Sequence, residues 1–267
     1  MVGNYVSRKV REFITDLCGA EVYREFYKLA MDALNTDLKQ SQDEEEKEEP
    51  RIYRQIPSSY IPIRKCLEDG ITNDKIERTL NYIANRNVKL LDWADLYICP
   101  NMGEAHFLIP CYENEKVVGY SLRYASDYVD VRYLHYVPRG HIFNSDTFNF
   151  PRKYHLLCEG QLDALALNCA SILGNELKKT QTRWIKILAN THNFVFLPDK
   201  DKAGSKIIDQ ILTEKLPISV SFPNWGVKDG FEAAKQYGRI KAVELALENI
   251  VSHRDETSLR VAASQWN

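Results

Sequence analysis

The stretch LLCEGQLDALAL, Leu156–Leu167, decides the fold, because an apolar run stops there at a carboxylate and a glycine. The apolar residues before Glu159 are typical of a short buried strand, and the residues after Gly160 have helical spacing. A second stretch, FVFLPDKDKAG at Phe194–Gly204, repeats the arrangement, because its apolar run ends at two aspartates. Both stretches predict a buried strand that ends in acidic residues and is followed by a helix.

The same alternation continues through the carboxyl-terminal half of the sequence. Short apolar strands alternating with amphipathic helices predict an α/β fold, with a parallel sheet covered by helices on both faces. Residues from about 253 onward are polar, and we expect them to fray. The predicted strands are 154–158, 171–173, 194–197 and 218–222, and the predicted helices are about 161–170, 180–190, 203–215 and 230–251.

The amino-terminal half of the sequence lacks this regular alternation of strands and helices. Residues 5–37 have helical periodicity, and a helix is predicted after the potential cap Asn73. AHFLIPCYENEKVVGYSLRYAS, from Ala105, predicts a hairpin with its turn at Glu113–Lys116. The predicted parts are an N-terminal helical segment (1–42), an acidic linker (43–50), a mixed α+β basic subdomain (51–150), the sheet domain (151–240) and a C-terminal helix and tail (241–267).

Composition limits the classes of protein to which this chain can belong. An apolar content of 44% is typical of a globular protein. The net charge is −2, but Asp43–Glu49 alone carries −5, so the rest of the chain is mildly basic at +3. The six cysteines lack the spacing of a zinc site, so we expect no zinc. Apolar runs are shorter than the roughly 18 residues of a membrane span, and without a signal peptide we expect a reducing cytoplasm and no membrane.

Acidic residues follow the predicted strands at the edge where parallel sheets form their crevice. Glu159 follows the first strand, and Asp199 and Asp201 follow the third. Asp163 lies in the first turn of the helix after the first strand, and Asp229 follows the fourth strand. Carboxylates brought this close repel one another, and Mg²⁺ or Mn²⁺ bound by their oxygens would relieve the repulsion. Each acid also has a structural alternative, as a helix cap, a helix N-terminal charge or a turn residue.

These motifs resemble the TOPRIM domain, in which one strand ends in Glu-Gly and a later strand ends in Asp-x-Asp. TOPRIM domains occur in bacterial and phage primases, in type IA and type II topoisomerases and in some nucleases. EGQLDALAL, DKDKAG and KDGFEAA are similar to the forms of these motifs in DnaG-like primases. The resemblance implies a TOPRIM-type parallel sheet flanked by helices, with Glu159, Asp199 and Asp201 as the main ligands of two metal ions. Asp163 and Asp229 would support them.

The residues before the sheet resemble the basic subdomain of the same primases. LIPCYENEKVVGYSLRY, VRYLHY and HIFN match its elements, and the match implies that Arg123 and Arg132 contact nucleoside triphosphates or the template backbone. Lys200 and Lys202 flank the acids, and they are either solvated surface charges or phosphate contacts. The helices before the linker are similar to the segment that follows the zinc module of phage primases, and we expect this protein to lack the zinc module itself.

The resemblance implies metal-dependent synthesis of short RNA primers on single-stranded DNA. The implied partners are the template, ribonucleoside triphosphates, and a replicative helicase or a separate zinc-module protein. The motif form and compact size suggest a phage protein acting in its host's cytoplasm. A TOPRIM nuclease that uses water as its nucleophile, and a non-catalytic primase-like subunit, are the alternatives that the acids leave open. A topoisomerase is disfavoured, because 267 residues leave no room for strand-passage machinery.

Overall fold

The computed structural model describes residues 52–87, 89–125 and 132–266. The chain divides into two units, Met1–Pro50 and Arg51–Asn267, and the second unit contains all the structure described below. The predicted helices at 5–37 and the acidic linker therefore lie outside the described residues. Within the described part, no helix is both long and apolar enough to cross a membrane.

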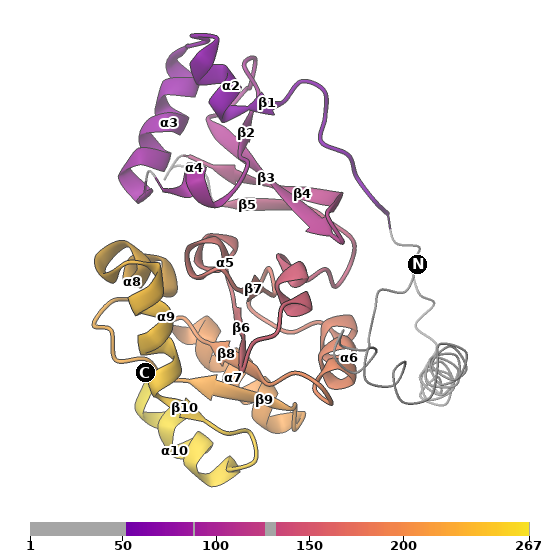
Figure 1. Cartoon of the computed structure of the whole chain (residues 1–267), viewed down its shortest axis with the longest axis vertical. Helices are drawn as coiled ribbons and strands as arrows, with labels where there is room; N and C mark the ends of the chain where they lie inside the picture. The colour runs from indigo at the N-terminus through magenta and orange to yellow at the C-terminus, as the bar shows by residue number, and fades with distance from the viewer. Residues whose placement is uncertain (1–51, 88, 126–131, 267) are drawn as a thin grey trace, which may run out of the picture. The chain divides into compact units, whose positions relative to one another are not determined.

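An antiparallel sheet forms the first half of the described unit (Figure 1). Its order along the sheet follows the chain, and Glu113 pairs with Lys116, which confirms the predicted hairpin. Asn114 and Glu115 form the two-residue turn with φ of 50° and 64°. The strands are β1 (Ile61–Pro62), β2 (Tyr97–Ile98), β3 (His106–Glu113), β4 (Lys116–Tyr124) and β5 (Tyr133–Tyr136).

Helices α2 (Ile63–Glu68), α3 (Asp74–Asn87) and α4 (Leu90–Trp93) accompany this sheet. Asn73 caps α3 as predicted, because its Oδ1 accepts hydrogen bonds from the backbone N–H groups of Lys75 and Ile76, both at 3.0 Å. The buried residues of α3 recur at intervals of three and four, so one face of the helix packs into the core.

The second sheet contains β6 (His155–Cys158), β7 (Ala170–Ser171), β8 (Phe194–Leu197), β9 (Ile218–Ser221) and β10 (Ile250–Val251). Its order is β10-β9-β8-β6-β7, and the pairs among β6 to β9 are parallel, as the alternating pattern predicts. β10 pairs antiparallel to β9 at one edge. The predicted parallel sheet is therefore confirmed, with one antiparallel strand added to it.

Helices cover both faces of the second sheet, and successive residues of each strand alternate between them. Leu156 packs in the core with α5, α8 and α9, whereas Leu157 packs in the core with α6 and α7. The helices are α5 (Gln161–Leu167), α6 (Lys179–Leu188), α7 (Lys202–Thr213), α8 (Gly230–Tyr237), α9 (Arg239–Glu248) and α10 (Glu256–Trp266), and a 3₁₀ helix, η1 (Ser145–Asn149), precedes β6.

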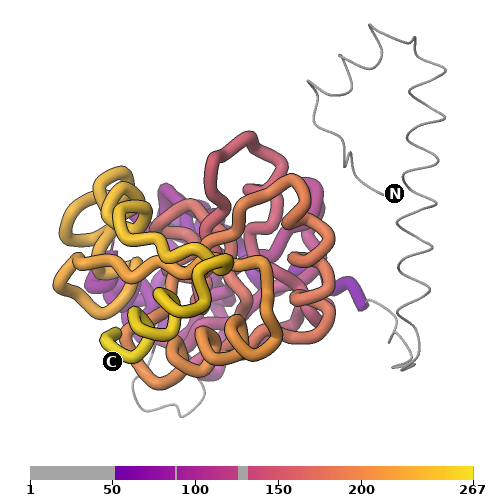
Figure 2. The backbone as a smooth tube through the Cα atoms, turned by 90° about the horizontal axis from the view of Figure 1, so that it is seen from below, coloured from indigo at the N-terminus to yellow at the C-terminus, as the bar shows by residue number. Residues whose placement is uncertain are grey.

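Two expectations for the carboxyl-terminal part are wrong. The single helix predicted over about 230–251 is broken at Gly238, whose φ of 82° ends α8 before α9 begins. The chain then turns into the edge strand β10. Residues 254–266 do not fray, because α10 buries Leu259 in the core. The helix also contacts α7, beside which its backbone runs in Figure 2.

Candidate functional site

Adjacent parallel strands bring Glu159 and Asp199 together. Cys158 at the end of β6 pairs in register with Leu197 at the end of β8, so the residues that follow leave the sheet side by side. Glu159 is buried, and its Oε1 accepts a hydrogen bond from the backbone N–H of Asp199 at 3.0 Å. The sequence prediction that these two acids converge is therefore borne out by the geometry.

Asp163 and Asp229 lie at the start of helices beside them. Asp163 is buried in the first turn of α5, and its Oδ1 accepts a hydrogen bond from the backbone N–H of Phe231 at 2.8 Å, linking α5 to α8. Asp229 is the N-cap of α8, and its Oδ1 accepts a bond from Glu232 N–H at 2.9 Å. The capping alternative is thus realised for Asp229, and it fixes one oxygen of that carboxylate.

Asp201 caps α7 in the same way. Its Oδ1 accepts hydrogen bonds from the N–H groups of Ala203 and Gly204 at 2.9 and 3.3 Å. Its Oδ2 lies 3.5 Å from the Nζ of Lys228. Gly204 is required next to the acids, because a Cβ there would lie 2.2 Å from the Asp199 carbonyl oxygen and 3.1 Å from Glu159 Oε1.

Burial and repulsion from neighbouring acids raise the pKa values of Glu159, Asp163 and Asp199. Burial, followed by repulsion from Asp199, raises the pKa of Glu159 to about 8. Burial, followed by repulsion from Asp229 and Asp201, raises the pKa of Asp199 to about 6. Burial, followed by repulsion from Asp229 and Asp199, holds the pKa of Asp163 well above its usual range. The site therefore concentrates negative charge that a bound cation would offset.

The donor set fits a hard divalent cation, since it consists of carboxylate oxygens with excess negative charge. Among the residues that the structure describes, however, no three His, Cys, Asp or Glu side chains converge on one ion position. Backbone N–H groups already hold one oxygen of Glu159, Asp163, Asp201 and Asp229. Shifts of these side chains would be needed before several of them could share one ion.

The two arginines predicted to bind nucleotide or template differ in burial. Arg123 is buried in β4, where its Nε and Nη2 donate hydrogen bonds to Tyr82 Oη at 3.0 and 2.6 Å. Its guanidinium also lies 4.5 Å from the centre of the Tyr133 ring. Arg132 is exposed just before β5. These contacts give Arg123 a structural role in packing β4 against α3 and β5.

The predicted lysines lie next to the acids, and one further lysine was missed. Lys200 and Lys202 are exposed on either side of Asp201, and Lys202 is the first residue of α7. Lys228, which sequence reasoning did not single out, pairs with Asp201. Its positive charge partly offsets the rise in the pKa values of Glu159 and Asp199. Its place directly before Asp229 in the KDGFEAA motif was the available signal.

No family model matches this sequence, and no curated protein matches it. The fold, however, resembles solved structures of primase catalytic domains. The RNA polymerase domain of Mycobacterium tuberculosis primase DnaG in complex with double-stranded DNA has a TM-score of 0.58 and 12% identity, covering 76% of this chain and 83% of that one. The DnaG primase catalytic domain bound to single-stranded DNA has a TM-score of 0.56 and 14% identity, covering 72% and 78%.

A further structure of the M. tuberculosis domain has a TM-score of 0.56 at 12% identity, covering 74% of this chain and 86% of that one. These identities are low, so the comparison establishes the fold and leaves the chemistry to be argued from the residues. The arrangement of an antiparallel sheet followed by a helix-covered parallel sheet therefore has the fold of a DnaG-type primase catalytic core.

Proposed function

We propose that this chain is the catalytic core of a DnaG-like primase of the TOPRIM superfamily, which makes short RNA primers on single-stranded DNA. The observation that carries this proposal is the meeting of Glu159 with Asp199 at neighbouring strand ends, with Asp201 two residues further on. In a fold that resembles primase catalytic domains, this acidic edge is the natural place for phosphoryl chemistry.

The reaction joins a 3′-hydroxyl to the α-phosphate of a ribonucleoside triphosphate and releases pyrophosphate. Glu159, Asp199 and Asp201 would hold two Mg²⁺ or Mn²⁺ ions, which supply charge stabilisation for the attacking and leaving oxygens. Asp163 and Asp229 support this site by holding α8 and adding negative charge. Lys228 and Lys200 supply positive charge for the phosphates.

The proposed partners follow from the same chemistry. Single-stranded DNA is the template, and contacts to its backbone make binding sensitive to salt. Arg132 is exposed and available for such a contact, whereas Arg123 would first have to leave Tyr82. We also propose that a replicative helicase or a separate zinc-module protein assists the enzyme, and that the protein is phage-encoded and acts in the host cytoplasm.

A metal-dependent TOPRIM nuclease is the second candidate, because the same acids could activate water. The burial of Arg123 favours this candidate, because the resemblance to primases assigns Arg123 to triphosphate binding, whereas its guanidinium is hydrogen-bonded to Tyr82. A non-catalytic replication subunit is the third candidate. The retained acids argue against it, because such a subunit has no need for five of them at one edge.

Incubation with Mg²⁺ or Mn²⁺, labelled ribonucleotides and single-stranded DNA separates these candidates. New oligoribonucleotides identify a primase, shortened DNA identifies a nuclease, and no product identifies a non-catalytic subunit. Runs with and without a helicase or zinc-module partner belong to the same assay.

Asp201→Asn is the informative variant for this assay. Asparagine caps helices as well as aspartate does, so α7 should stay folded while synthesis is lost. Asp209→Asn is the matched control, because it removes an exposed acid from the same helix. An Asp201→Asn enzyme with the activity of the Asp209→Asn control would overturn the assignment of Asp201.

A further inference from the structure

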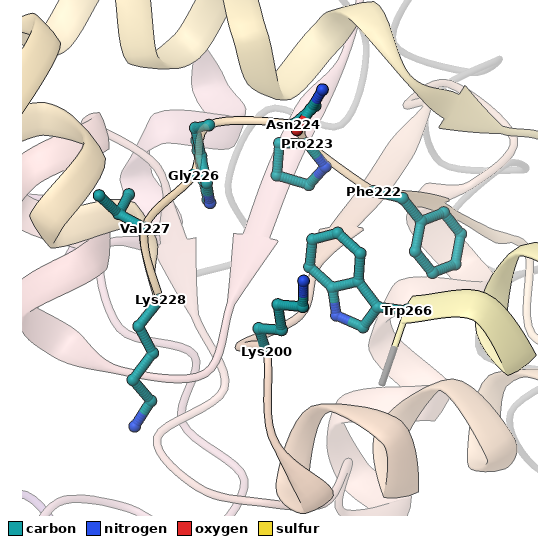
Figure 3. A pocket seen from close by; sticks show the side chains of 9 residues that line it. Lys200, Phe222, Pro223, Asn224, Gly226, Val227, Lys228 and Trp266 are labelled. Atoms are coloured by element: carbon teal, nitrogen blue, oxygen red, sulfur yellow. The ribbon is translucent and has the colours of Figure 1, made fainter.

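A cavity of about 540 Å³ lies beside the acidic edge, and the reaction described above uses only Lys200 and Lys228 of the residues that line it. Its wall is the loop Phe222–Lys228 after β9, joined by Lys200 from the loop after β8 and by Trp266 at the end of α10 (Figure 3). It thus gathers segments that are far apart in the sequence around the carboxyl ends of two neighbouring parallel strands.

The loop that forms this wall is held in place from three directions. The backbone N–H of Phe222 donates to the Asn249 carbonyl at 3.0 Å, and that of Lys200 donates to the Lys228 carbonyl at 3.3 Å. The hydroxyl of Tyr237 donates to the carbonyl of Trp225 at 2.7 Å. The cavity is therefore formed before any ligand arrives, which reduces the entropy cost of binding.

One side of the cavity is aromatic. The rings of Phe222 and Trp266 meet edge to face with their centres 5.5 Å apart, and the Lys200 ammonium lies 5.5 Å from the Trp266 ring centre (Figure 3). Among the described residues, the buried indole N–H groups of Trp225 and Trp266 have no hydrogen-bond partner. The Phe222 and Trp266 side chains are only half-buried, so a planar ligand can stack on the part of the rings that stays exposed.

The chemistry of the wall changes in one direction along it. Lys228 extends away from the aromatic pair in Figure 3, and its Nζ lies 3.5 Å from Asp201 Oδ2. Aromatic rings, ammonium groups and then carboxylates therefore follow one another. A nucleotide presents the matching order of a planar base, anionic phosphate and phosphate oxygens that share a metal with carboxylates.

We propose that this cavity binds one nucleotide, with its base against Trp266 and Phe222 and its phosphate between Lys200 and Lys228. The nucleotide belongs either to a ribonucleoside triphosphate or to a DNA strand, since both present the same base and phosphate. The site rests on the proposed function, because its phosphate end leads to the acids. It adds an aromatic base-binding wall from β9 and α10 that the acidic motifs do not predict.

Direct binding tests the aromatic wall without requiring catalysis. Wild-type protein is titrated with ATP and Mg²⁺ in one arm and with a labelled oligodeoxythymidylate in the other. Trp266→Ala should weaken the arm that uses the site by about tenfold, a typical loss for one stacked base. Phe150→Ala is the matched control, because it removes an aromatic ring that is 60% exposed elsewhere on the surface. The arm that changes identifies the source of the nucleotide.

Two gentler variants keep the test valid if Trp266→Ala unfolds α10. Trp266→Phe retains an aromatic face and should keep most of the affinity. Lys200→Met retains the apolar stem and should weaken binding while reducing its dependence on salt, because one phosphate contact is lost. Unchanged affinity in both arms for folded Trp266→Ala overturns the proposal. Where Trp266→Ala does not fold, unchanged affinity and salt dependence for Lys200→Met overturn it.

The outcome is separable from that of the proposed function. If the wild type makes no primer but Trp266→Ala still weakens nucleotide binding, primer synthesis is rejected and the nucleotide site is supported. If the wild type makes primers but these substitutions leave nucleotide binding unchanged, primer synthesis is supported and the nucleotide site is rejected.

Discussion

The two ends of β6 bury titratable groups in opposite ways. His155 at the start of the strand lies among aromatic rings, with the ring centres of His192 at 4.6 Å and Phe148 at 5.6 Å. Glu159, directly after the strand, lies among carboxylates. Burial lowers the pKa of His155 to about 4 and raises that of Glu159 to about 8. Both groups are therefore driven toward their neutral forms.

The two ends of β6 differ in the side chains that surround the buried group. At the His155 end, a neutral imidazole packs among aromatic rings, although its buried Nδ1 has no hydrogen-bond partner among the described residues. At the Glu159 end, the neighbours are further acids, so neutrality only limits a repulsion that a cation would remove. One end of the strand therefore packs a neutral ring among aromatic side chains, and the other places Glu159 beside carboxylates that repel it.

The largest effect is expected from Glu159→Gln. Glutamine can still accept the Asp199 N–H bond, but it removes a charge and a metal ligand. We expect primer synthesis to fall by more than about a hundredfold, since even groups that only orient ligands cost 10–100-fold. At about pH 9 the metal-free variant should nevertheless be more stable than the wild type, because the folded-state pKa of Glu159 is raised to about 8.

Urea unfolding with and without Mg²⁺ or Mn²⁺ checks the stability part of this prediction. The wild type should gain more stability from the metal than the variant does. At about pH 4, where Glu159 is protonated in the folded protein, the difference between the metal-free proteins should vanish. A variant that is less stable at high pH yet keeps the full metal response would show that the acids do not repel one another in a shared site.

The other end of β6 should respond to pH with the opposite sign. The folded-state pKa of His155 lies below the unfolded value of about 6.5. Its contribution to stability is therefore complete above about pH 6.5 and is lost as the pH falls toward 4, by no more than about 3 kcal/mol. His155→Phe should flatten the pH dependence of the free energy of unfolding in this window. A pH dependence identical to the wild type would assign the effect to other groups.

The smallest effect concerns backbone packing at the acidic end. Gly204→Ala should destabilise the protein by about 1–3 kcal/mol, because the new Cβ meets the Asp199 backbone, which cannot move aside cheaply. Gly103→Ala is the control, since a Cβ there has no atom within 4 Å. Thermal unfolding of both variants gives the comparison. Equal melting temperatures would mean that the acidic loop adapts more freely than its close contact implies.

Sequence reasoning predicted the parts of the fold that repeat a pattern. Alternating strands and helices predicted the parallel sheet, and strand ends predicted the meeting of Glu159 with Asp199. Interruptions of a pattern were harder to predict. A helical period runs through Gly238 without a visible break, and the two-residue strand β10 is too short for alternation to reveal it.

Long-range contacts account for the remaining differences. Nothing local distinguishes Arg123 from a surface arginine, because its partner Tyr82 lies 41 residues away on α3. The cavity beside the acids depends on Trp266, which reaches it only because α10 packs back onto the sheet domain. Lys228 alone could have been found from its motif.

The short strands at both borders of the parallel sheet have a consequence for behaviour in concentrated solution. β10 and β7 contain two residues each, and Phe143 forms an antiparallel bridge to Ser171 of β7. Long, flat border strands recruit strands from other molecules and thereby start aggregation. Because the four-residue apolar strands β6 and β8 lie inside these two-residue borders, the sheet offers little template for such growth.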